Sequence, residues 1–473
     1  MKNNKSNTGR LKCGILLFTF GMVAGVLLVL LLQSGPSTPE PVESNEKNSF
    51  QQVTGRLNKG GALYFYLSTQ QMVISIKERI AVLKGMLITG GNPAKNREKE
   101  SEAIIKLLES LIINSGITET SGIGMSQITL ANGLQHSKMI LHHHKGKNEG
   151  LIWNLFKDKP HTMDCLNMLP SNTVLAGFTD CRIDYAWKWL KTQVGTSGLM
   201  PLQRVMVVWD SALKMQGITL ADLLPSIDDQ IGFVATMDPK NKMPLPGAAE
   251  TILKLPRPSM ALVLSVKDNQ LFNVLTQMLR GPQGNAAPAA NDGKFFLPFP
   301  GLPFQWKPVI AQHQGFLVIA TDETIISEMW EAKKGGNRLT ETKEFKALAL
   351  DMPVKGNHFR YVNPLLMTTI RDLFKAGFSR FDSGASGYGY FDLLNPFPAD
   401  LKVYSVLQNM EEGLVITANH NMPAHTFMMT PSLASIFVGT LFYSLYPDVP
   451  STHAIDGPSD IPPQPVEKKA RIN

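Results

Sequence analysis

An unbroken apolar run near the N-terminus, CGILLFTFGMVAGVLLVLLL, constrains this chain more than any other feature. The run covers residues 13–32 and contains neither a charged residue nor a proline. A helix needs about 20 such residues to cross a hydrocarbon core of about 30 Å, so the sequence predicts one transmembrane helix here. The run exceeds the ~7–15 apolar residues of a cleaved signal peptide, and no A-x-A-like site follows it, which favours an uncleaved signal-anchor over a cleaved leader.

Charges on the two sides of this run predict its orientation. Four cations precede it, with no acidic residue among them: Lys2, Lys5, Arg10 and Lys12. Three acidic residues follow it closely: Glu40, Glu43 and Glu46. Because positive charge is retained in the cytoplasm, we expect residues 1–12 to be cytoplasmic and the chain after the run to be extracytoplasmic. The predicted location is the inner cell membrane, crossed once.

Two glycines within the run suggest how the predicted helix could pack. Gly21 and Gly25 form a GxxxG pattern, which lets two membrane helices approach closely. The pattern is consistent with a homodimer that packs through these glycines. A chance pair of glycines in an apolar span is the alternative interpretation.

Composition excludes a general nucleic-acid-binding protein. The net charge is +7, but the four N-terminal cations supply more than half of it, so the rest of the chain is nearly neutral. Hydrophobic residues make up 43% of the 473 residues and charged residues 18%, which is ordinary for a globular protein with a sizeable core.

Two cysteines lie beyond the apolar run, Cys165 and Cys181. They bracket a predicted strand at residues 173–178, whose ends are separated by roughly 20 Å at ~3.3 Å per residue. A disulfide needs Cα atoms within about 7 Å of each other. We therefore expect both thiols to be unpaired.

A recurring unit of strand, polar turn and helix organises the chain after a flexible linker at residues 33–50. The strands of its four copies are predicted at residues 62–67, 173–178, 260–266 and 358–362, each followed by a helical stretch. The strand starts are about 100 residues apart, which is too long for a solenoid and indicates duplicated modules.

Hairpin-like segments lie between the helices. An Asn132-Gly133 turn divides residues 127–143, and Gln314-Gly315 divides residues 309–321. Residues 230–237 and 402–418 are also strand-rich. The predicted fold class is therefore α+β, with duplicated strand–helix units and antiparallel hairpins, preceded by one N-terminal transmembrane helix.

The extracytoplasmic part is expected to form two α+β halves, residues 51–254 and 255–425. An uncharged segment at residues 426–446 follows, which we interpret as a buried or interfacial helix because polar residues and proline dilute it. A second membrane span is the alternative for this segment. The last residues, 447–473, are rich in proline and charge and are predicted to be disordered.

No motif in the chain fixes a chemistry: G-x-S-x-G, Walker, GxGxxG, H-E-x-x-H and paired CxxC patterns are all missing from the sequence. Several residues are nevertheless candidates for a site: His136, His142, His143, His144, His161, Asp228, Asp229, Asp238, Tyr185, Trp187 and Trp189. Alternation along a strand lets at most His142 and His144 share a face, which is a weak metal site. The aspartates are typical of strand-entry turns, and the aromatic residues of a helix in contact with the core.

Three segments carry a resemblance to a known family: EGLIWNLFKDKPHTMDCLNMLPSNTVLAGFTDCRIDYAWKWL at residues 149–190, LPRPSMALVLSVKD at 255–268, and GFLVIATDETIISEMWEAKKGGNRLTETKEFKALALDMP at 315–353. Together they resemble an uncharacterised family of signal-anchored bacterial envelope proteins, the domain-of-unknown-function family numbered thirty-three fifty-two. The resemblance covers roughly residues 50–420 and implies an architecture and a location, but no activity and no site residues.

These observations predict a single-pass membrane protein of the bacterial envelope that binds or scaffolds rather than catalyses. No cofactor, metal or nucleic acid is expected, and the expected partner is another envelope protein. The first alternative is a carrier or sensor of an apolar or envelope-derived ligand held between sheet and helices. The second is an envelope hydrolase whose catalytic residues are too dispersed for a motif.

Overall fold

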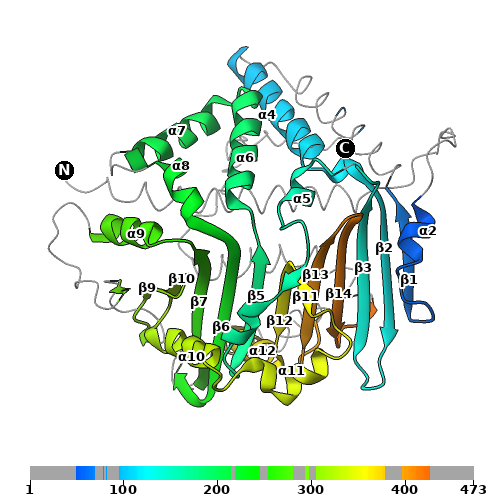
Figure 1. Ribbon diagram of the computed structural model, residues 1–473, viewed down its shortest axis with the longest axis vertical. Helices are drawn as coiled ribbons and strands as arrows, with labels where there is room; N and C mark the ends of the chain where they lie inside the picture. The colour runs from blue at the N-terminus through cyan, green and yellow to red at the C-terminus, as the bar shows by residue number, and fades with distance from the viewer. Residues whose placement is uncertain are drawn as a thin grey trace, which may run out of the picture. The chain divides into compact units, whose positions relative to one another are not determined.

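A twelve-stranded antiparallel sheet organises the part of the chain that the structure describes (Figure 1). This computed structural model describes residues 49–69, 78, 81, 95–146, 148–214, 219–244, 254–280, 293–297, 305–378, 397–424 and 426. The chain divides into two units, Met1–Gln33 with Met428–Asn473, and Ser34–Phe427. All described residues belong to the second unit.

The sheet runs in the order β1-β2-β3-β14-β13-β12-β5-β6-β7-β10-β9-β8, and every neighbouring pair of strands is antiparallel. Its strands are β1 (Leu63–Ser68), β2 (Thr120–Thr129), β3 (Gln135–His143), β5 (Thr173–Asp180), β6 (Ile227–Pro244), β7 (Lys254–Val266), β8 (Lys294–Phe296), β9 (Val309–His313), β10 (Phe316–Ala320), β12 (His358–Val362), β13 (Val403–Met410) and β14 (Gly413–His420). A separate two-stranded ribbon pairs β4 (His161–Thr162) with β11 (Lys355–Gly356).

Ten α-helices occur among the described residues, so the predicted mixed α+β class is confirmed. They are α2 (Phe50–Thr54), α4 (Lys95–Asn114), α5 (Leu151–Asn154), α6 (Ile183–Ser197), α7 (Met200–Lys214), α8 (Leu220–Leu223), α9 (Gln270–Arg280), α10 (Glu323–Lys333), α11 (Lys343–Leu348) and α12 (Pro364–Phe378). Short 3₁₀ turns include η2 (Asp164–Met168) and η5 (Leu339–Glu341).

Three of the four predicted strand–helix junctions are present as expected. Strand β5 leads into α6, β7 into α9, and β12 into α12. Short polar side chains begin two of these helices: Asp268 Oδ1 accepts from the Gln270 N–H, and Asn363 Oδ1 accepts from the Leu365 N–H. The first predicted strand is β1, whereas the helix expected after it lies almost entirely outside the described residues.

Both predicted hairpin turns are confirmed. Strands β2 and β3 are joined through Asn132-Gly133, where Gly133 has a φ of +80°. Strands β9 and β10 are joined through Gln314 and Gly315, with φ values of +48° and +77°. Two successive residues with positive φ give the twist that a two-residue hairpin requires.

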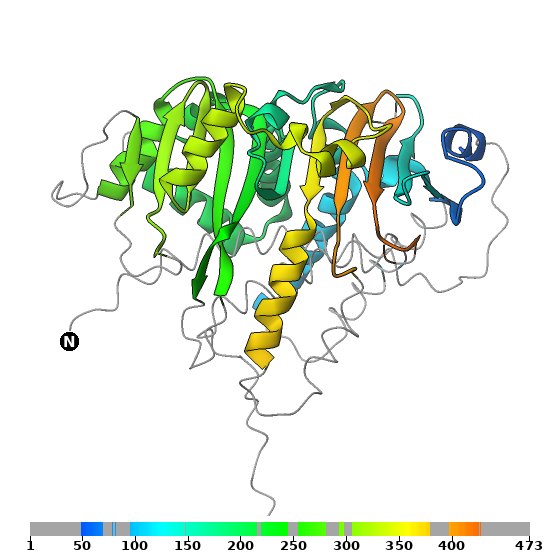
Figure 2. The same cartoon turned by 90° about the horizontal axis from the view of Figure 1, so that it is seen from below.

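One face of the sheet, here called the closed face, carries the main core. Phe178 of β5 and Phe359 of β12 stack there with ring centroids 5.6 Å apart. The cluster around them includes residues of η2, α10, η5 and α11, such as Met168, Met329 and Phe345. In Figure 2, α10 and α11 lie along the upper side of the sheet and α12 projects from the lower side.

The opposite face, here called the open face, is covered in two separate places. Residues of α12, including Leu365 and Leu366, pack over Ala235 and Met260. Residues of α9 and α8, including Phe272 and Leu223, pack with Leu264.

Several predicted segments lie outside the described residues: the transmembrane run with Gly21 and Gly25, the linker up to residue 48, the apolar segment from residue 427 and the tail. Within the part of the chain that is described, no helix is long and apolar enough to cross a membrane. The predicted boundary between the two halves falls at the start of β7, which pairs with β6 in the same sheet. Cys165 and Cys181 are both free, as expected.

Two neighbouring glycines give a direct test of the two faces. A Cβ on Gly232 would lie 2.2–2.6 Å from ring atoms of the buried Phe178, whereas a Cβ on Gly177 would meet only the Phe359 carbonyl oxygen, at 3.4 Å. Because overpacking a filled core costs about 1–3 kcal/mol, Gly232→Ala should lower the free energy of unfolding by that amount. Gly177→Ala is the matched control and should change it by less than about 0.5 kcal/mol. Equal effects in urea denaturation would contradict this assignment of the faces.

Candidate functional site

A row of four residues crosses the uncovered strip of the open face. Strand register places Arg360 opposite Gly177, Gly177 opposite Phe233, and Phe233 opposite Leu262. Directly opposed residues of antiparallel strands project from the same face, so these four positions form one continuous line across β12, β5, β6 and β7. We call this line the open row.

Side chains of the open row are accessible although they lie in the middle of a sheet. Phe233 is 37% exposed and Leu262 is 40% exposed. Arg360 is also exposed, and no helix of the described part of the chain has an atom within 4 Å of a Cβ built on Gly177. Their neighbours Val234, Val263 and Phe359, which point to the closed face, are no more than 1% exposed. The central strands thus have one filled face and one unfilled face.

The two helix clusters limit the width of the open row. Along β7, Leu262 lies between Met260, which packs in the α12 cluster, and Leu264, which packs in the α9 cluster. Alternate residues of a strand are about 6.6 Å apart, so the uncovered strip is about one side chain wide. Across the sheet it ends at Ile319, opposite Leu262, because Ile319 packs in the α9 cluster.

Arg360 brings an unbalanced positive charge to this apolar strip. No hydrogen bond or ion pair joins its guanidinium to another described residue. Surrounding protein atoms desolvate it and lower its pKa. An arginine nevertheless stays charged in proteins, and no carboxylate in the described part of the chain pairs with this exposed guanidinium.

His358, two residues away on the same face, does not add a second charge. Burial, and to a smaller extent the nearby Arg360 guanidinium, lower its pKa to about 4. At neutral pH the imidazole is therefore neutral. The open row presents one cation beside an apolar surface.

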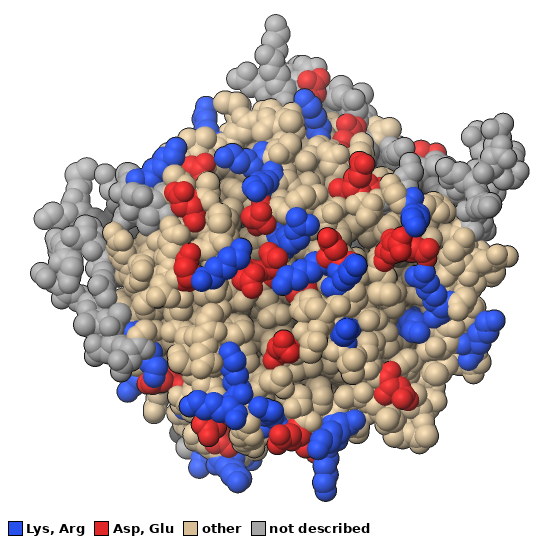
Figure 3. All heavy atoms as spheres, viewed as in Figure 1, with Lys and Arg blue, Asp and Glu red and all other residues tan. Residues whose placement is uncertain are grey.

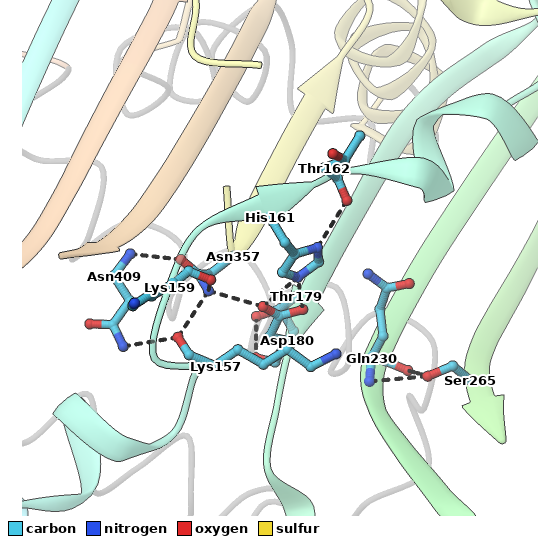
Figure 4. A network of polar contacts seen from close by, with 10 residues as sticks. All are labelled: Lys157, Lys159, His161, Thr162, Thr179, Asp180, Gln230, Ser265, Asn357 and Asn409. Atoms are coloured by element: carbon cyan, nitrogen blue, oxygen red, sulfur yellow. Dashed lines mark hydrogen bonds and ion pairs between the residues drawn. The ribbon is translucent and has the colours of Figure 1, made fainter. Parts of the chain in front are cut away.

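A second candidate site is a buried polar network at the end of β5 (Figure 4). Asp180 is 1% exposed, and both of its carboxylate oxygens lie 2.8–2.9 Å from His161 Nε2. Asn357 Nδ2 donates to Asp180 and to the carbonyls of Lys157 and Lys159, and Asn409 Nδ2 donates to the carbonyl of Lys157. Burial raises the pKa of Asp180, while the contacts with His161 oppose that shift.

The geometry of this network indicates a structural role. His161 Nδ1 lies 2.9 Å from the Thr162 carbonyl oxygen, so this nitrogen must carry a proton, and Nε2 is engaged by Asp180. Neither ring nitrogen is left to accept a proton from a substrate. The network instead ties the 157–162 segment, and with it the β4–β11 ribbon, to the ends of β5 and β13.

The other histidines weighed from the sequence are also explained by local contacts. The rings of His142 and His144 lie 6.0 Å apart, as the predicted strand alternation required, and His143 packs against Trp153. His142 Nδ1 contacts Ser121 Oγ at 2.6 Å, but the imidazole is 3% exposed. His136 contacts Asn419. Among the described residues no group of three or more histidine, cysteine, aspartate or glutamate side chains could hold a metal ion.

The remaining candidates from the sequence are dispersed. Asp228 and Asp229 lie at the start of β6, and Asp238 caps the Lys240 N–H within the same strand. In α6, Trp189 Nε1 donates to the Asn114 carbonyl, and Tyr185 contacts Arg182. Burial raises the pKa of Cys165 to about 12 and also raises that of Cys181, so neither is an activated thiol.

Two small cavities are lined by polar groups that contact one another. One of about 400 Å³ lies at the start of α10, where Asp322 accepts from Ser259 Oγ and from the Thr324 N–H and faces Arg257 at 3.6 Å. The other, about 280 Å³, contains Glu328, whose pKa is raised by burial and which accepts from Asn172. Figure 3 shows cationic and acidic side chains intermingled over the face in view.

Comparison with known proteins gives no relative: no family model, no curated protein and no solved structure matches the chain.

The open row was not predicted from the sequence, although one pattern in the sequence indicates it. In HFRYV, residues 358–362, the aromatic residues alternate with His358, Arg360 and Val362. That alternation places an arginine on a face whose other members are apolar or neutral.

Loss of Asp180 should expose the structural role of the polar network. Asp180→Ala leaves the donors of His161 and Asn357 without their buried acceptor, so the free energy of unfolding should fall by about 3 kcal/mol. Asp184→Ala removes an exposed ion pair with Lys188 and should cost less than about 1 kcal/mol. Chemical denaturation of both variants checks this, and a cost for Asp180→Ala no greater than the control would refute it.

Buried histidines predict acid sensitivity. The pKa values of His142, His358 and His420 are each lowered by burial to about 4, whereas an unfolded histidine titrates near 6.5. As the pH falls from about 6.5 to about 4, the unfolded state binds protons that the folded state does not, so stability decreases with falling pH.

The contribution of His420 can be isolated, since its ring is fully buried and its Nε2 contacts Ser137 Oγ. His420→Gln should reduce the slope of unfolding free energy against pH between pH 6.5 and 5, whatever its effect on stability at pH 7. Urea denaturation at several pH values in this range measures the slope for the wild type and for His420→Gln. Parallel slopes would contradict the lowered pKa.

Proposed function

We propose that this chain is a membrane-anchored extracytoplasmic binding protein of the bacterial envelope, and that it acts without catalysis. Its anchor would be the apolar run at residues 13–32, with Gly21 and Gly25 as a helix-packing face for a homodimer. The cations before the run and the acidic residues after it support the orientation. The resemblance of residues 50–420 to the signal-anchored envelope family is part of the same proposal.

We also infer that the sheet arose from duplicated strand–helix units. Support comes from the order of elements: β5, β6 and β7 follow one another in the sheet with helices inserted after β5, and β12, β13 and β14 do the same with α12 after β12. Strands β1, β2 and β3 also lie in consecutive order. Such repeated meanders explain how one sheet reaches twelve strands.

The open row is the observation that carries the binding proposal. A sheet face normally buries its apolar side chains, and here Phe233 and Leu262 stay accessible between two covered clusters. Among the residues that the structure describes, two polar pairs were candidates for catalysis, but the imidazole of the Ser121–His142 pair is buried and both nitrogens of His161 are engaged. The favoured function is therefore contact with a ligand or partner at the open row.

A carrier or sensor of an apolar, envelope-derived ligand is the second candidate, and the same row favours it. The strip is about one side chain wide, which suits a narrow ligand better than the broad, flat surface of a large protein interface. The predicted membrane anchor still favours an envelope protein as the first candidate partner, because confinement near the membrane raises the effective concentration of neighbouring proteins.

Orientation is tested by reporters fused after Asn48 of the full N-terminal segment. The positive-inside pattern predicts activity from a reporter that works only outside the cytoplasm, and none from a reporter that works only in the cytoplasm. Activity of the cytoplasmic reporter would overturn the proposed location.

Binding is tested by crosslinking in intact membranes, followed by extraction of the tagged full chain. A bound component should be recovered with the wild type, lost with Phe233→Asp, and retained with Val354→Asp, which changes an 81% exposed valine away from the open row. Thermal unfolding verifies that both variants fold. Reproducible turnover in a hydrolase screen, abolished by one polar-to-alanine change, would defeat the non-enzymatic proposal.

A further inference from the structure

The open row has a chemical polarity that narrows its ligand, and the inference drawn from it rests on the proposed binding function. We propose that it binds the single acyl chain of a long-chain fatty acid, with the carboxylate on Arg360 and the chain over Gly177 towards Phe233 and Leu262. Three observations support this ligand class: the charge, its position and the width of the strip.

The positive charge of Arg360 favours a ligand that carries one negative charge. Arg360 has no acidic partner among the described residues, and the causes that shift its pKa include no neighbouring carboxylate. A guanidinium binds a carboxylate through two parallel N–H···O bonds, and such charge-assisted bonds strengthen where water is partly excluded. Since His358 is neutral at pH 7, a monoanion balances the row, whereas a dianionic phosphate would leave it negative.

The position of Arg360 and the width of the uncovered strip favour one apolar chain attached to that anion. Arg360 lies between Ser405 of β13, which is half-buried, and Gly177 of β5, so the apolar members of the row all lie on one side of the guanidinium. Gly177, which separates Arg360 from Phe233, has no side chain to obstruct a ligand. At β7 the strip is flanked by Met260 in the α12 cluster and Leu264 in the α9 cluster, which leaves the width of one row of side chains, about 6.6 Å, between them. One acyl chain fits this width, while the two chains of a phospholipid would displace packed residues.

The row is long enough to contact the first part of a long acyl chain. Strands are spaced about 4.8 Å apart, so the three steps from Arg360 to Leu262 span about 14 Å. The far end is bounded by Ile319, which is packed against the α9 cluster. An extended acyl chain along this line would cover Phe233 and Leu262, the two exposed apolar side chains of the row.

The test is photo-labelling of membranes that contain the full chain. The probe is a palmitate analogue with a diazirine in the chain and a terminal alkyne, and the labelled residues are located by peptide mapping. We expect light-dependent labelling on β5, β6 and β7 around the open row. Excess palmitate should suppress this labelling at least tenfold more effectively than the same concentration of hexadecanol, which lacks the carboxylate.

Arg360→Gln should reduce labelling about tenfold or more, while Arg204→Gln, a change of an exposed arginine on α7, should leave it unchanged. Thermal unfolding verifies the folding of both variants, and the hexadecanol comparison needs no variant at all. Equal competition by hexadecanol, or unchanged labelling of Arg360→Gln, would overturn the pairing of a carboxylate with Arg360.

Two further outcomes separate this inference from the proposed function. Competition by dioleoylphosphatidylglycerol but not by palmitate would overturn the fatty-acid class and leave a binding function in place. No labelling of the open strands would overturn the ligand, while the loss of a crosslinked component in Phe233→Asp would still support binding. Failure of both experiments would reject the open row as a binding surface.

Discussion

The packing of Phe178 over Gly232 and against Phe359 is the interaction on which the rest of this sheet depends. It fills the closed face at the junction of β12, β5 and β6, under η2 and α10. Because side chains alternate along a strand, the placement of these residues on the closed face places Gly177, Phe233 and Arg360 on the open face. A slip of one residue would bury the guanidinium in the main core and expose two phenylalanines, so the register is strongly specified.

The same constraint explains why the open row is open. The closed face is covered continuously across the central strands, whereas on the open face the helices that follow β7 and β12 cover only their own surroundings. Between them, Gly177 removes the one side chain that would fill the row, and Arg360 prevents an apolar element from closing over it without the cost of burying a charge. An accessible apolar strip with one cation is what remains.

How much of this was predictable from the sequence depended on whether a signal was local. The turns at Asn132-Gly133 and Gln314-Gly315 and the junctions into α9 and α12 follow from residue types within a few positions, and they were predicted. The open row was not, because its four members come from strands up to about 180 residues apart and meet only through register. The Asp180–Asn357 network was missed for the same reason: its partners lie on β5 and beside β11.

The middle of the open face is accessible, whereas the opposite face of the same strands is filled. Hydroxyl-radical footprinting of the full chain in membranes measures this directly through two phenylalanines on neighbouring strands. Phe233 should be oxidised at a rate similar to that of Phe296, which is 36% exposed, while Phe178, at 2%, should be protected. Protection of Phe233 equal to that of Phe178 would contradict the account.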